Sequence, residues 1–396
     1  MDLRTRFDAD VGQVDAAEFF AVDLPAAVER HPDLVERLVG LNLRPLRIEV
    51  DGRSWVLQRD AEGTPRVTGD GDTSLTLRLT ADQLSDLVND QITPVGLMTA
   101  GSLDLEPMRI GGLMDWWLVL RSLLDERPIH TSGGVDLPDD LGRSFTLDDD
   151  PEELRAYLAR AGYLHLRGVY TPEEMQRISD DMDAAEPGYA DGDGHSWWAT
   201  LSDGSRRVVR MQRFEDRSPT TTALLDDDRL RALGRLPGCG HTVDVGREYR
   251  VEALFKPLGV RQGISDVPWH KDCSLGRHSY ECCSLTIGIS VTGAGPTSGQ
   301  LRVVPGSHRA LVWPSLFDAA QLDLPDLPLP TEAGDVTVHL SCTLHMAQPP
   351  TERERKVLYT GFRLPPRDAD AAETGRRRLR AARDSAPLTT SQAPAG

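Results

Sequence analysis

The chain has 396 residues, 39% of them hydrophobic and 27% charged, which is typical of a soluble globular protein long enough for two domains. Its formal net charge of −18 argues against nucleic acids and anionic membranes as partners, because phosphate groups are bound by clustered Lys and Arg. We expect neither a signal peptide nor a membrane span. The N-terminal residues lack a basic segment followed by an apolar one, and no apolar run reaches spanning length.

The five cysteines are odd in number and include no C-x-x-C pair. This pattern argues against a disulfide framework and against a structural zinc site, and it favours a reducing, cytoplasmic location. Only three of the 44 basic residues are lysine, and all three lie in the part of the chain that carries the motifs described below: Lys256, Lys271 and Lys356.

The first third of the chain predicts a small α+β unit, with apolar residues at helical spacing first and turn-bounded strands after them. In chain order we expect helices over 1–45, a hairpin that turns at Asp51-Gly52, a strand over 74–80, a helix over 81–92, a strand over 99–107 and a long apolar helix over 111–127.

This pattern resembles the sterol carrier protein family of lipid-binding domains over about residues 35–127. The matching segments are Leu75-Thr76-Leu77, Ala81-Asp82-Gln83-Leu84 and Thr99-Ala100-Gly101-Ser102-Leu103. The resemblance implies an apolar cavity that could take a lipid or acyl ligand. A small accessory domain that packs against its neighbour and binds nothing fits the same pattern equally well. We assign residues 1–127 to this sterol-carrier-like domain.

Residues 128–149 are rich in Gly, Pro and Asp and are predicted to form a linker. A second domain over 150–366 then opens with a helix, a strand over 163–167 and a second helix that starts at Thr171-Pro172. Residues 188–207 are predicted to be a loop, in which Trp197 and Trp198 form either a substrate-binding wall or a hydrophobic plug between domains. Residues 367–396 are predicted to be a disordered tail.

Most of the chemistry is expected from the segment 266–309, whose centre is His270-Lys271-Asp272. Alternate residues of a β-strand face the same side, so His270 and Asp272 would present an imidazole and a carboxylate together. These are two of the three ligands of the 2-His-1-carboxylate site of non-haem iron(II) oxygenases. A His-x-Asp triplet is common by itself, so the segments that follow it decide its meaning.

Residues 150–366 resemble the phytanoyl-CoA dioxygenase family of iron(II)- and 2-oxoglutarate-dependent oxygenases. The motifs that carry this resemblance occur in the order that the family has: Ala161-Gly162-Tyr163-Leu164, Phe255-Lys256-Pro257, Pro268-Trp269-His270-Lys271-Asp272, Val304-Pro305-Gly306-Ser307-His308-Arg309, and Leu344-His345 followed by Arg355. The resemblance implies a double-stranded β-helix core (jelly-roll, cupin-like) with flanking helices. It also implies iron(II), 2-oxoglutarate and O2. The expected fold class is therefore a two-domain α+β protein in which this core follows the smaller sterol-carrier-like domain.

The third metal ligand should be a histidine from a distant strand, and the downstream candidates are His278, His308, His339 and His345. His345 is preferred over His339 because Arg355 follows ten residues later, which leaves room for a turn and a return strand beside the metal. His308 is expected to hold its own turn or to support the ligands. The predicted metal ligands are thus His270, Asp272 and His345.

Arg355 is expected to bind the remote carboxylate of 2-oxoglutarate, because a guanidinium group binds a carboxylate through two parallel hydrogen bonds. Ala347 stands where the family often has a hydroxyl residue, so another group must complete the co-substrate pocket. Arg210, Gln212 and Thr286 are the candidates for that role.

The predicted activity is oxidation of an unactivated C–H bond in a small metabolite or lipid-like substrate, with release of succinate and CO2. Asp272 favours hydroxylation, desaturation or cyclisation, because related halogenases carry Gly or Ala there to admit a halide. Two alternatives remain. One is a non-catalytic lipid or small-molecule binding protein that uses the N-terminal domain, and the other is a metal-dependent isomerase or cupin-like protein that works without 2-oxoglutarate and does not need Arg355. Lys271 is expected to point away from the metal and to pack or pair behind it.

Overall fold

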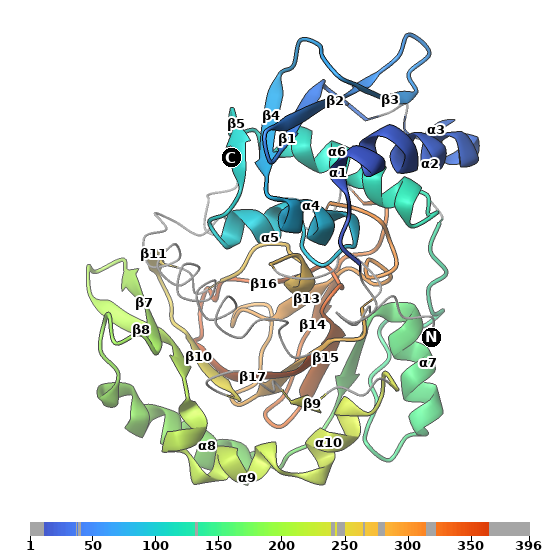
Figure 1. The fold of residues 1–396 in the computed structure, drawn as a ribbon. Coiled ribbons are helices and arrows are strands. Elements are labelled where there is room, and N and C mark those ends of the chain that lie inside the picture. The colour runs from blue at the N-terminus through green and yellow to red at the C-terminus, as the bar shows by residue number, and fades with distance from the viewer. Residues whose placement is uncertain are drawn as a thin grey trace.

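In the computed structural model the chain forms an N-terminal α+β unit (residues 12–124) and a C-terminal unit (residues 145–363) built on two β-sheets (Figure 1). The structure describes residues 12–36, 38, 41–130, 134–238, 242–243, 250–263, 266–275, 282–313 and 322–363. The tail predicted over 367–396 and the candidate ligand His278 lie outside these ranges. Among the described residues no helix is both long enough and apolar enough to cross a membrane.

The N-terminal unit packs helices against one five-stranded sheet of order β3-β2-β1-β4-β5. Its strands are β1 (Leu46–Val50), β2 (Arg53–Arg59), β3 (Pro65–Thr68), β4 (Leu75–Leu79) and β5 (Asp104–Glu106). Its helical segments are α1 (Ala16–Glu18), η2 (Phe19–Asp23), α2 (Leu24–Arg30), α3 (Pro32–Glu36), α4 (Ala81–Val88), α5 (Pro94–Thr99) and α6 (Ile110–Leu124). Strands β1 and β4 are parallel, and the other neighbouring pairs are antiparallel.

Local sequence explains the turns and helix starts of this unit. The hairpin expected at Asp51-Gly52 joins β1 to β2, and both residues have positive φ, as a two-residue hairpin turn requires. Helix α4 begins with a capping box, in which Thr80 and Gln83 each bind the other's backbone N–H. Helix α6 then buries Trp116 and Trp117 in the core of the unit.

The C-terminal unit contains a nine-stranded major sheet and a three-stranded minor sheet, and all of their pairs are antiparallel. The major sheet comprises β6 (Tyr163–Leu166), β7 (Ser196–Leu201), β8 (Arg206–Gln212), β9 (Thr242–Val243), β10 (Glu252–Lys256), β11 (Val260–Gln262), β12 (Leu285–Ser290), β15 (Val336–Leu340) and β17 (Arg355–Arg363). The minor sheet comprises β13 (Leu301–Val303), β14 (Leu327–Leu329) and β16 (His345–Ala347). Apolar side chains of both sheets share one core, as expected of a jelly roll.

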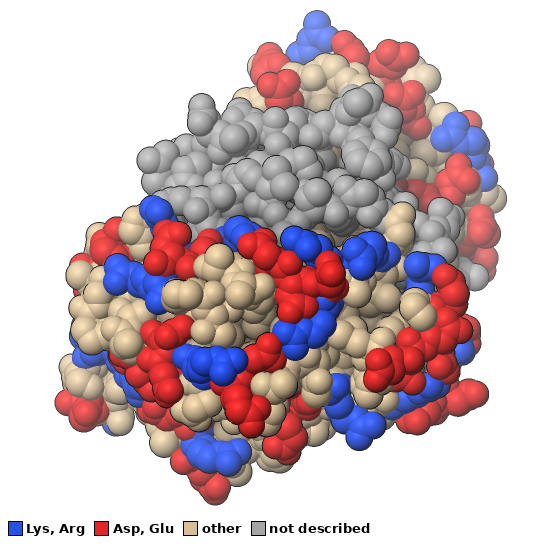
Figure 2. Space-filling model, turned by 90° about the horizontal axis from the view of Figure 1, so that it is seen from below, with Lys and Arg blue, Asp and Glu red and all other residues tan. Residues whose placement is uncertain are grey.

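Helices cover the outer side of the major sheet (Figure 1). These are α7 (Pro151–Ala161), α8 (Pro172–Ala185), α9 (Pro219–Leu225) and α10 (Asp228–Gly234), with the short turns η4 (Glu186–Gly188) and η5 (Phe214–Arg217). On the face seen in Figure 2, acidic and basic side chains are interspersed. The net charge of −18 is therefore not gathered into one patch on that face.

Two expectations about local structure were wrong. Residues 196–201 form strand β7 where a loop was predicted, because they pair with β8 across a turn at Asp203-Gly204. The His-x-Asp triplet is not a continuous strand. His270 makes an isolated bridge to His345, and Asp272 begins the 3₁₀ turn η6 (Asp272–Leu275).

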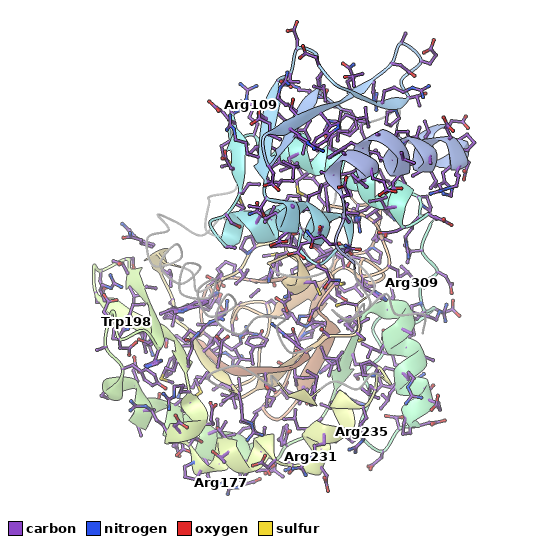
Figure 3. All side chains as sticks on the ribbon, in the orientation of Figure 1. Arg109, Arg177, Trp198, Arg231, Arg235 and Arg309 are labelled. Atoms are coloured by element: carbon purple, nitrogen blue, oxygen red, sulfur yellow. The ribbon has the colours of Figure 1, made fainter. Side chains whose placement is uncertain are left out.

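The two units are joined by backbone pairing and by apolar packing. Ile129 bridges Leu311 in parallel, and the N–H of His130 donates to the carbonyl of Leu311 (3.0 Å). Trp313 packs against Ile129, Leu311 and helix α6. It also donates a hydrogen bond to Asp115 of that helix. Arg309, just before this segment, lies at the boundary of the two units (Figure 3). Helix α5 packs on η6, so the N-terminal unit touches the turn that carries Asp272.

Candidate metal centre

His270, Asp272 and His345 come together at one end of the minor sheet. One ligand atom from each lies within 4.8 Å of the others. The Oδ1 atom of Asp272 is 3.3 Å from Nε2 of His270 and 3.8 Å from Nε2 of His345. The two histidines are fixed to each other by a pair of backbone hydrogen bonds of 3.0 Å. The sequence-based trio therefore forms a group able to hold a metal ion.

Both imidazole rings are oriented by backbone carbonyls. Nδ1 of His270 is 2.6 Å from the carbonyl oxygen of Pro268, and Nδ1 of His345 is 3.0 Å from that of Thr343. A carbonyl oxygen only accepts, so each Nδ1 must carry the proton. In a neutral imidazole this leaves Nε2 unprotonated and directed toward Asp272, which is the tautomer that a metal ligand needs.

The two oxygens of Asp272 have different surroundings. Oδ1 faces the two histidines just described, whereas Oδ2 accepts a hydrogen bond of 2.6 Å from the Thr286 hydroxyl. Oδ2 also lies 3.4 Å from Nε2 of His339 and 3.9 Å from Nη2 of Arg363. Arg363 in turn donates to the Thr286 hydroxyl (3.1 Å). This arrangement presents one carboxylate oxygen to a metal and holds the other.

Protonation at this site favours metal binding. Burial alone would raise the pKa of Asp272, but His345, His270 and His339 around it hold that pKa well below its usual value. Burial, reinforced by His339 and His270, lowers the pKa of His345 well below its usual value. An ionised carboxylate and a neutral imidazole are the forms that bind metals.

His339 lies in this centre, although the sequence favoured His345 over it. Its ring centroid is 4.1 Å from that of His345, and its side chain is buried. It stands opposite Thr286 in the β12–β15 pair, so both side chains reach the same carboxylate oxygen. The strand alternation after Gly334-Asp335 was the available signal, since Thr337 and His339 fall on one face.

Arg355 opens strand β17 and is only 4% exposed. Its Nε and Nη2 atoms are buried and have no hydrogen-bond partner among the described residues. The neighbouring Lys256 is paired instead with Asp266, with Nζ and Oδ1 2.5 Å apart. A buried guanidinium with unused donors is unfavourable by itself. The carboxylate of a bound 2-oxo acid is a ligand that these donors fit.

The other predicted co-substrate residues are engaged within the protein. Arg210 forms an ion pair with Glu252 (2.5 Å) and lies over the ring of Trp197. Gln212 donates to the second oxygen of the same carboxylate (3.0 Å). Of the three candidates, the structure brings only Thr286 to the metal trio. Contacts of Arg210 and Gln212 with the co-substrate remain predictions.

Trp197 and Trp198 occupy successive positions of β7 and therefore face opposite sides of the major sheet. Trp197 is buried in a small cluster with Ala199 and Val260. Trp198, labelled in Figure 3, packs against the main core and donates to the hydroxyl of Ser196 (2.9 Å). A substrate wall built from both rings remains a prediction, and the two cannot line one face.

Lys271 and His308 support the centre from behind, as the sequence suggested. The ammonium of Lys271 is fully buried and donates to the carbonyls of Ser307 (3.0 Å) and Ala310 (3.3 Å). Burial lowers its pKa to about 8. Nε2 of His308 donates to the carbonyl of Ala159 (3.0 Å), and burial lowers the pKa of this histidine to about 4.

Among solved structures, similar chains include AviO1 from Streptomyces viridochromogenes Tue57, at 21% identity over 55% of this chain and 96% of that chain, with a TM-score of 0.44. The non-heme alpha ketoglutarate dependent epimerase SnoN from nogalamycin biosynthesis is 21% identical over 54% of this chain and 82% of that chain (TM-score 0.42). EctD from S. alaskensis with bound Fe is 19% identical over 64% of this chain and 92% of that chain (TM-score 0.45). These scores are low, and no curated protein matched the chain.

The family comparison is more informative. Residues 158–357 match the family described as Phytanoyl-CoA dioxygenase (PhyH). The matched range covers just over half of the chain and contains His270, Asp272, His345 and Arg355. The chain therefore belongs to the phytanoyl-CoA dioxygenase family and is an iron(II)- and 2-oxoglutarate-dependent oxygenase.

Proposed function

We propose that His270, Asp272 and His345 hold the iron and that Arg355 binds the remote carboxylate of 2-oxoglutarate. The role of Arg355 rests on its two buried nitrogen donors that have no partner among the described residues. The iron site is supported by the convergence of the three ligand atoms and by the fixed tautomers of both histidines. A facial set of three protein ligands leaves positions open for a chelating co-substrate and for O2.

Iron(II), 2-oxoglutarate and O2 together supply an oxidant able to remove hydrogen from an unactivated C–H bond, with release of succinate and CO2. The protein's part is positioning. Thr286 holds Oδ2 of Asp272 while Oδ1 faces the histidines, which favours binding through a single oxygen. We propose that the outcome is hydroxylation, desaturation or cyclisation of a small molecule and not halogenation, because the carboxylate of Asp272 fills the place where halogenases admit a halide.

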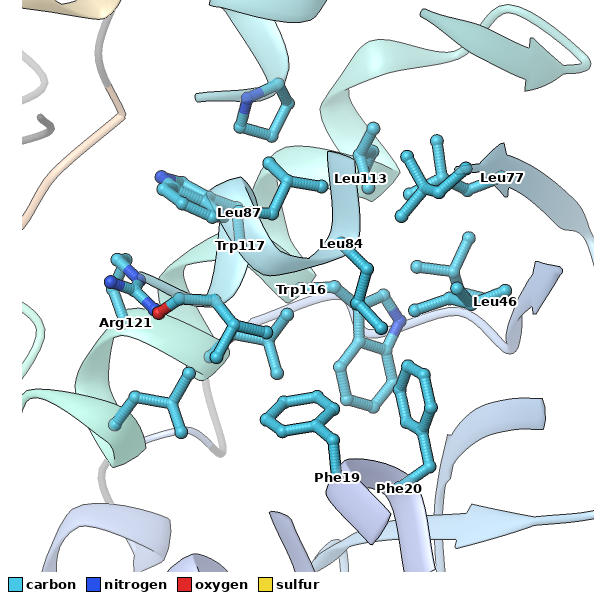
Figure 4. A pocket seen from close by; sticks show the side chains of 16 residues that line it. Phe19, Phe20, Leu46, Leu77, Leu84, Leu87, Leu113, Trp116, Trp117 and Arg121 are labelled. Atoms are coloured by element: carbon cyan, nitrogen blue, oxygen red, sulfur yellow. The ribbon is translucent and has the colours of Figure 1, made fainter. Parts of the chain in front are cut away.

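We further propose that the N-terminal unit is a sterol-carrier-like domain, with domain limits at 1–127, 128–149 and 150–366. Separate hydrophobic cores support this division. An apolar cavity of about 30 Å³ lies inside the unit, with Phe19, Leu84 and Trp116 among its walls (Figure 4). Apart from Arg121, its lining side chains are apolar.

This cavity is too small for an acyl chain, since it has room for about two water molecules. Helix α5 of this unit packs on η6, which supports a role in holding the turn that carries Asp272. We therefore favour an accessory domain that holds the turn of Asp272 over one that carries a lipid. A lipid that binds the full-length protein stoichiometrically and widens this cavity would reverse that preference.

The proposed activity is tested by succinate release from 2-oxoglutarate under O2, with iron(II) added to the full chain. We expect release that depends on iron, rises with the correct substrate, is lost in His270→Ala and needs a higher 2-oxoglutarate concentration in Arg355→Gln. Arg353→Gln is the matched control, because Arg353 is an exposed arginine two residues before Arg355. An active His270→Ala enzyme would rule out the proposed iron site.

A further inference from the structure

Three cysteines from separate segments meet behind the metal centre. Cys273 follows Asp272 in η6, Cys282 precedes β12, and Cys342 lies between β15 and β16. The sulfur atoms of Cys273 and Cys282 are 2.8 Å apart, and the thiol of Cys342 donates to Cys273 at 3.2 Å. The three sulfur atoms all lie within 4.8 Å of one another.

Packing alone is a weak explanation for this arrangement. A buried cysteine usually behaves as a small apolar side chain that touches carbon atoms. Here the three thiols are at most 8% exposed and form a cluster of their own, apart from the larger apolar cores. Their sulfur atoms are directed at one another, so three soft ligand atoms converge on one point.

A cation stands beside the three thiols. The ammonium of Lys271, two residues before Cys273, is buried in the same region and donates to the carbonyls of Ser307 and Ala310. Three thiolates around Zn²⁺ carry a net charge of −1, which one lysine neutralises. Around Cu⁺ the same thiolates would carry −2. The charge balance therefore favours a divalent ion.

We propose that Cys273, Cys282 and Cys342 bind one thiophilic divalent ion, Zn²⁺, as thiolates, although their spacing along the chain argued against a zinc site. Each thiol releases its proton to water as its sulfur–metal bond forms. With Zn–S bonds of about 2.3 Å, tetrahedral geometry places the sulfur atoms about 3.8 Å apart. The thiols therefore need to separate by about 1 Å or less. Zinc with three protein ligands keeps its fourth position for water or another small ligand.

Such an ion would tie together the two segments that carry the iron ligands. Cys273 is the next residue after Asp272, and Cys342 lies three residues before His345. The backbone already links these segments, since the N–H of Cys273 donates to the carbonyl of Ser341 (3.0 Å). The bound ion fixes η6 against the start of β16 and so holds Asp272 facing His345.

The test uses the full chain purified without oxygen, with Zn²⁺ and Co²⁺ as the probes. Thiolate-bound Co²⁺ shows an intense sulfur-to-metal charge-transfer band, which cobalt at a His-Asp-His site does not. Cys282→Ser and Cys342→Ser each remove one sulfur of the trio. Cys283→Ser is the matched control, because Cys283 is also buried but is not part of the trio. His270→Ala separates the thiol site from the iron site.

We expect one equivalent of Co²⁺ to produce the band in the wild type, in Cys283→Ser and in His270→Ala. Zn²⁺ should displace the cobalt, and both trio variants should bind at least 100-fold more weakly. If those variants fail to fold, thiol counting on the native wild type decides, because Zn²⁺ should protect three thiols from a thiol reagent. The absence of the band, its persistence in Cys282→Ser, or a disulfide among the three in oxygen-free protein would overturn the proposal.

Discussion

At the scale of single residues, the geometry around Asp272 explains how a carboxylate can bind iron through one oxygen. The hydroxyl of Thr286 holds Oδ2, and His339 and Arg363 approach the same atom. Partners of this kind orient a ligand without touching the metal. Thr286 therefore contacts the metal ligand Asp272, and the co-substrate contact expected of it stays a prediction.

Replacing Thr286 by valine should weaken iron binding by about 10- to 100-fold, because Oδ2 loses its closest donor while the residue keeps its shape. Thr286→Ser keeps the hydroxyl and should bind iron like the wild type. The measurement is competition for iron(II) against a coloured chelator without oxygen. Equal affinities in Thr286→Val and Thr286→Ser would show that the hydrogen bond does not position the ligand.

The sequence pointed to those residues of the centre that belong to motifs with a recognisable spacing along the chain. His270 and Asp272 are two apart, and Arg355 follows His345 by ten residues. It named His339 only as the less favoured candidate for the third metal ligand and did not point to Arg363, because the approach of both side chains to Asp272 depends on the register of β15 and β17 against β12. Register is set by long-range pairing that no local pattern records.

At the scale of elements, the Pro-Gly-Ser-His turn joins three parts of the C-terminal unit. The N–H of Gly306 donates to the carbonyl of Ala161 (2.9 Å), and the N–H of Leu344 donates to the hydroxyl of Ser307 (2.7 Å). The turn thereby connects the end of α7 to the residue before His345. His308 completes it, with its ring packed against Gly162, whose positive φ and missing Cβ leave the space.

This packing predicts an acid-sensitive step in stability. The pKa of His308 is about 4 in the folded protein, against 6.5 in the unfolded chain. Between those pH values His308 binds a proton in the unfolded chain but not in the folded protein. The contribution of neutral His308 to the free energy of unfolding is therefore fully present above pH 6.5 and is lost as the pH falls toward 4. The loss from His308 amounts to about 3 kcal/mol.

The check is denaturant unfolding of the wild type and His308→Gln at several pH values. Glutamine stays neutral, so the stability difference between the two proteins should shift by about 3 kcal/mol in favour of the variant as the pH falls from 7 to 4. A difference that does not change with pH would mean that His308 titrates normally.

Helix starts and turns that depend on neighbouring residues were predicted well. Strands that depend on pairing with another strand were predicted poorly. The helix start at Thr171-Pro172 and the turn at Asp51-Gly52 are present as predicted. Strand β7 was predicted to be a loop, because glycine and aspartate surround it and only its pairing with β8 makes it a strand. The His-x-Asp triplet was expected on a strand, but it ends in the turn η6, which packs against α5 of the other unit.

At the scale of the whole molecule, an apolar cluster of described residues joins the two units. Trp313 packs in it with Leu118 of α6 and Leu311. The backbone of Ile129 extends the contact by pairing with Leu311. The separation into two cores was predictable from composition, but this contact was not, because Trp313 sits in a segment without a regular pattern.

We expect the two units to unfold in one transition, because the shared contact couples their cores. Trp313→Ala should lower the free energy of unfolding by about 2 kcal/mol, less than removal of a fully buried aromatic side chain, because Trp313 is only partly buried. Scanning calorimetry of the full chain measures both effects. Two separate transitions in the wild type, or no change in Trp313→Ala, would contradict this coupling.

The central claim is that His270, Asp272 and His345 hold iron while Arg355 binds 2-oxoglutarate. Its most direct test is titration of the iron(II)-loaded protein with 2-oxoglutarate in the absence of oxygen, following the visible absorption band of a 2-oxo acid chelated to iron(II). We predict a saturable band in the wild type and in Arg353→Gln, no band in His270→Ala, and about 10- to 100-fold weaker binding in Arg355→Gln. A wild-type titration curve from Arg355→Gln, or a band from His270→Ala, would contradict the assignment.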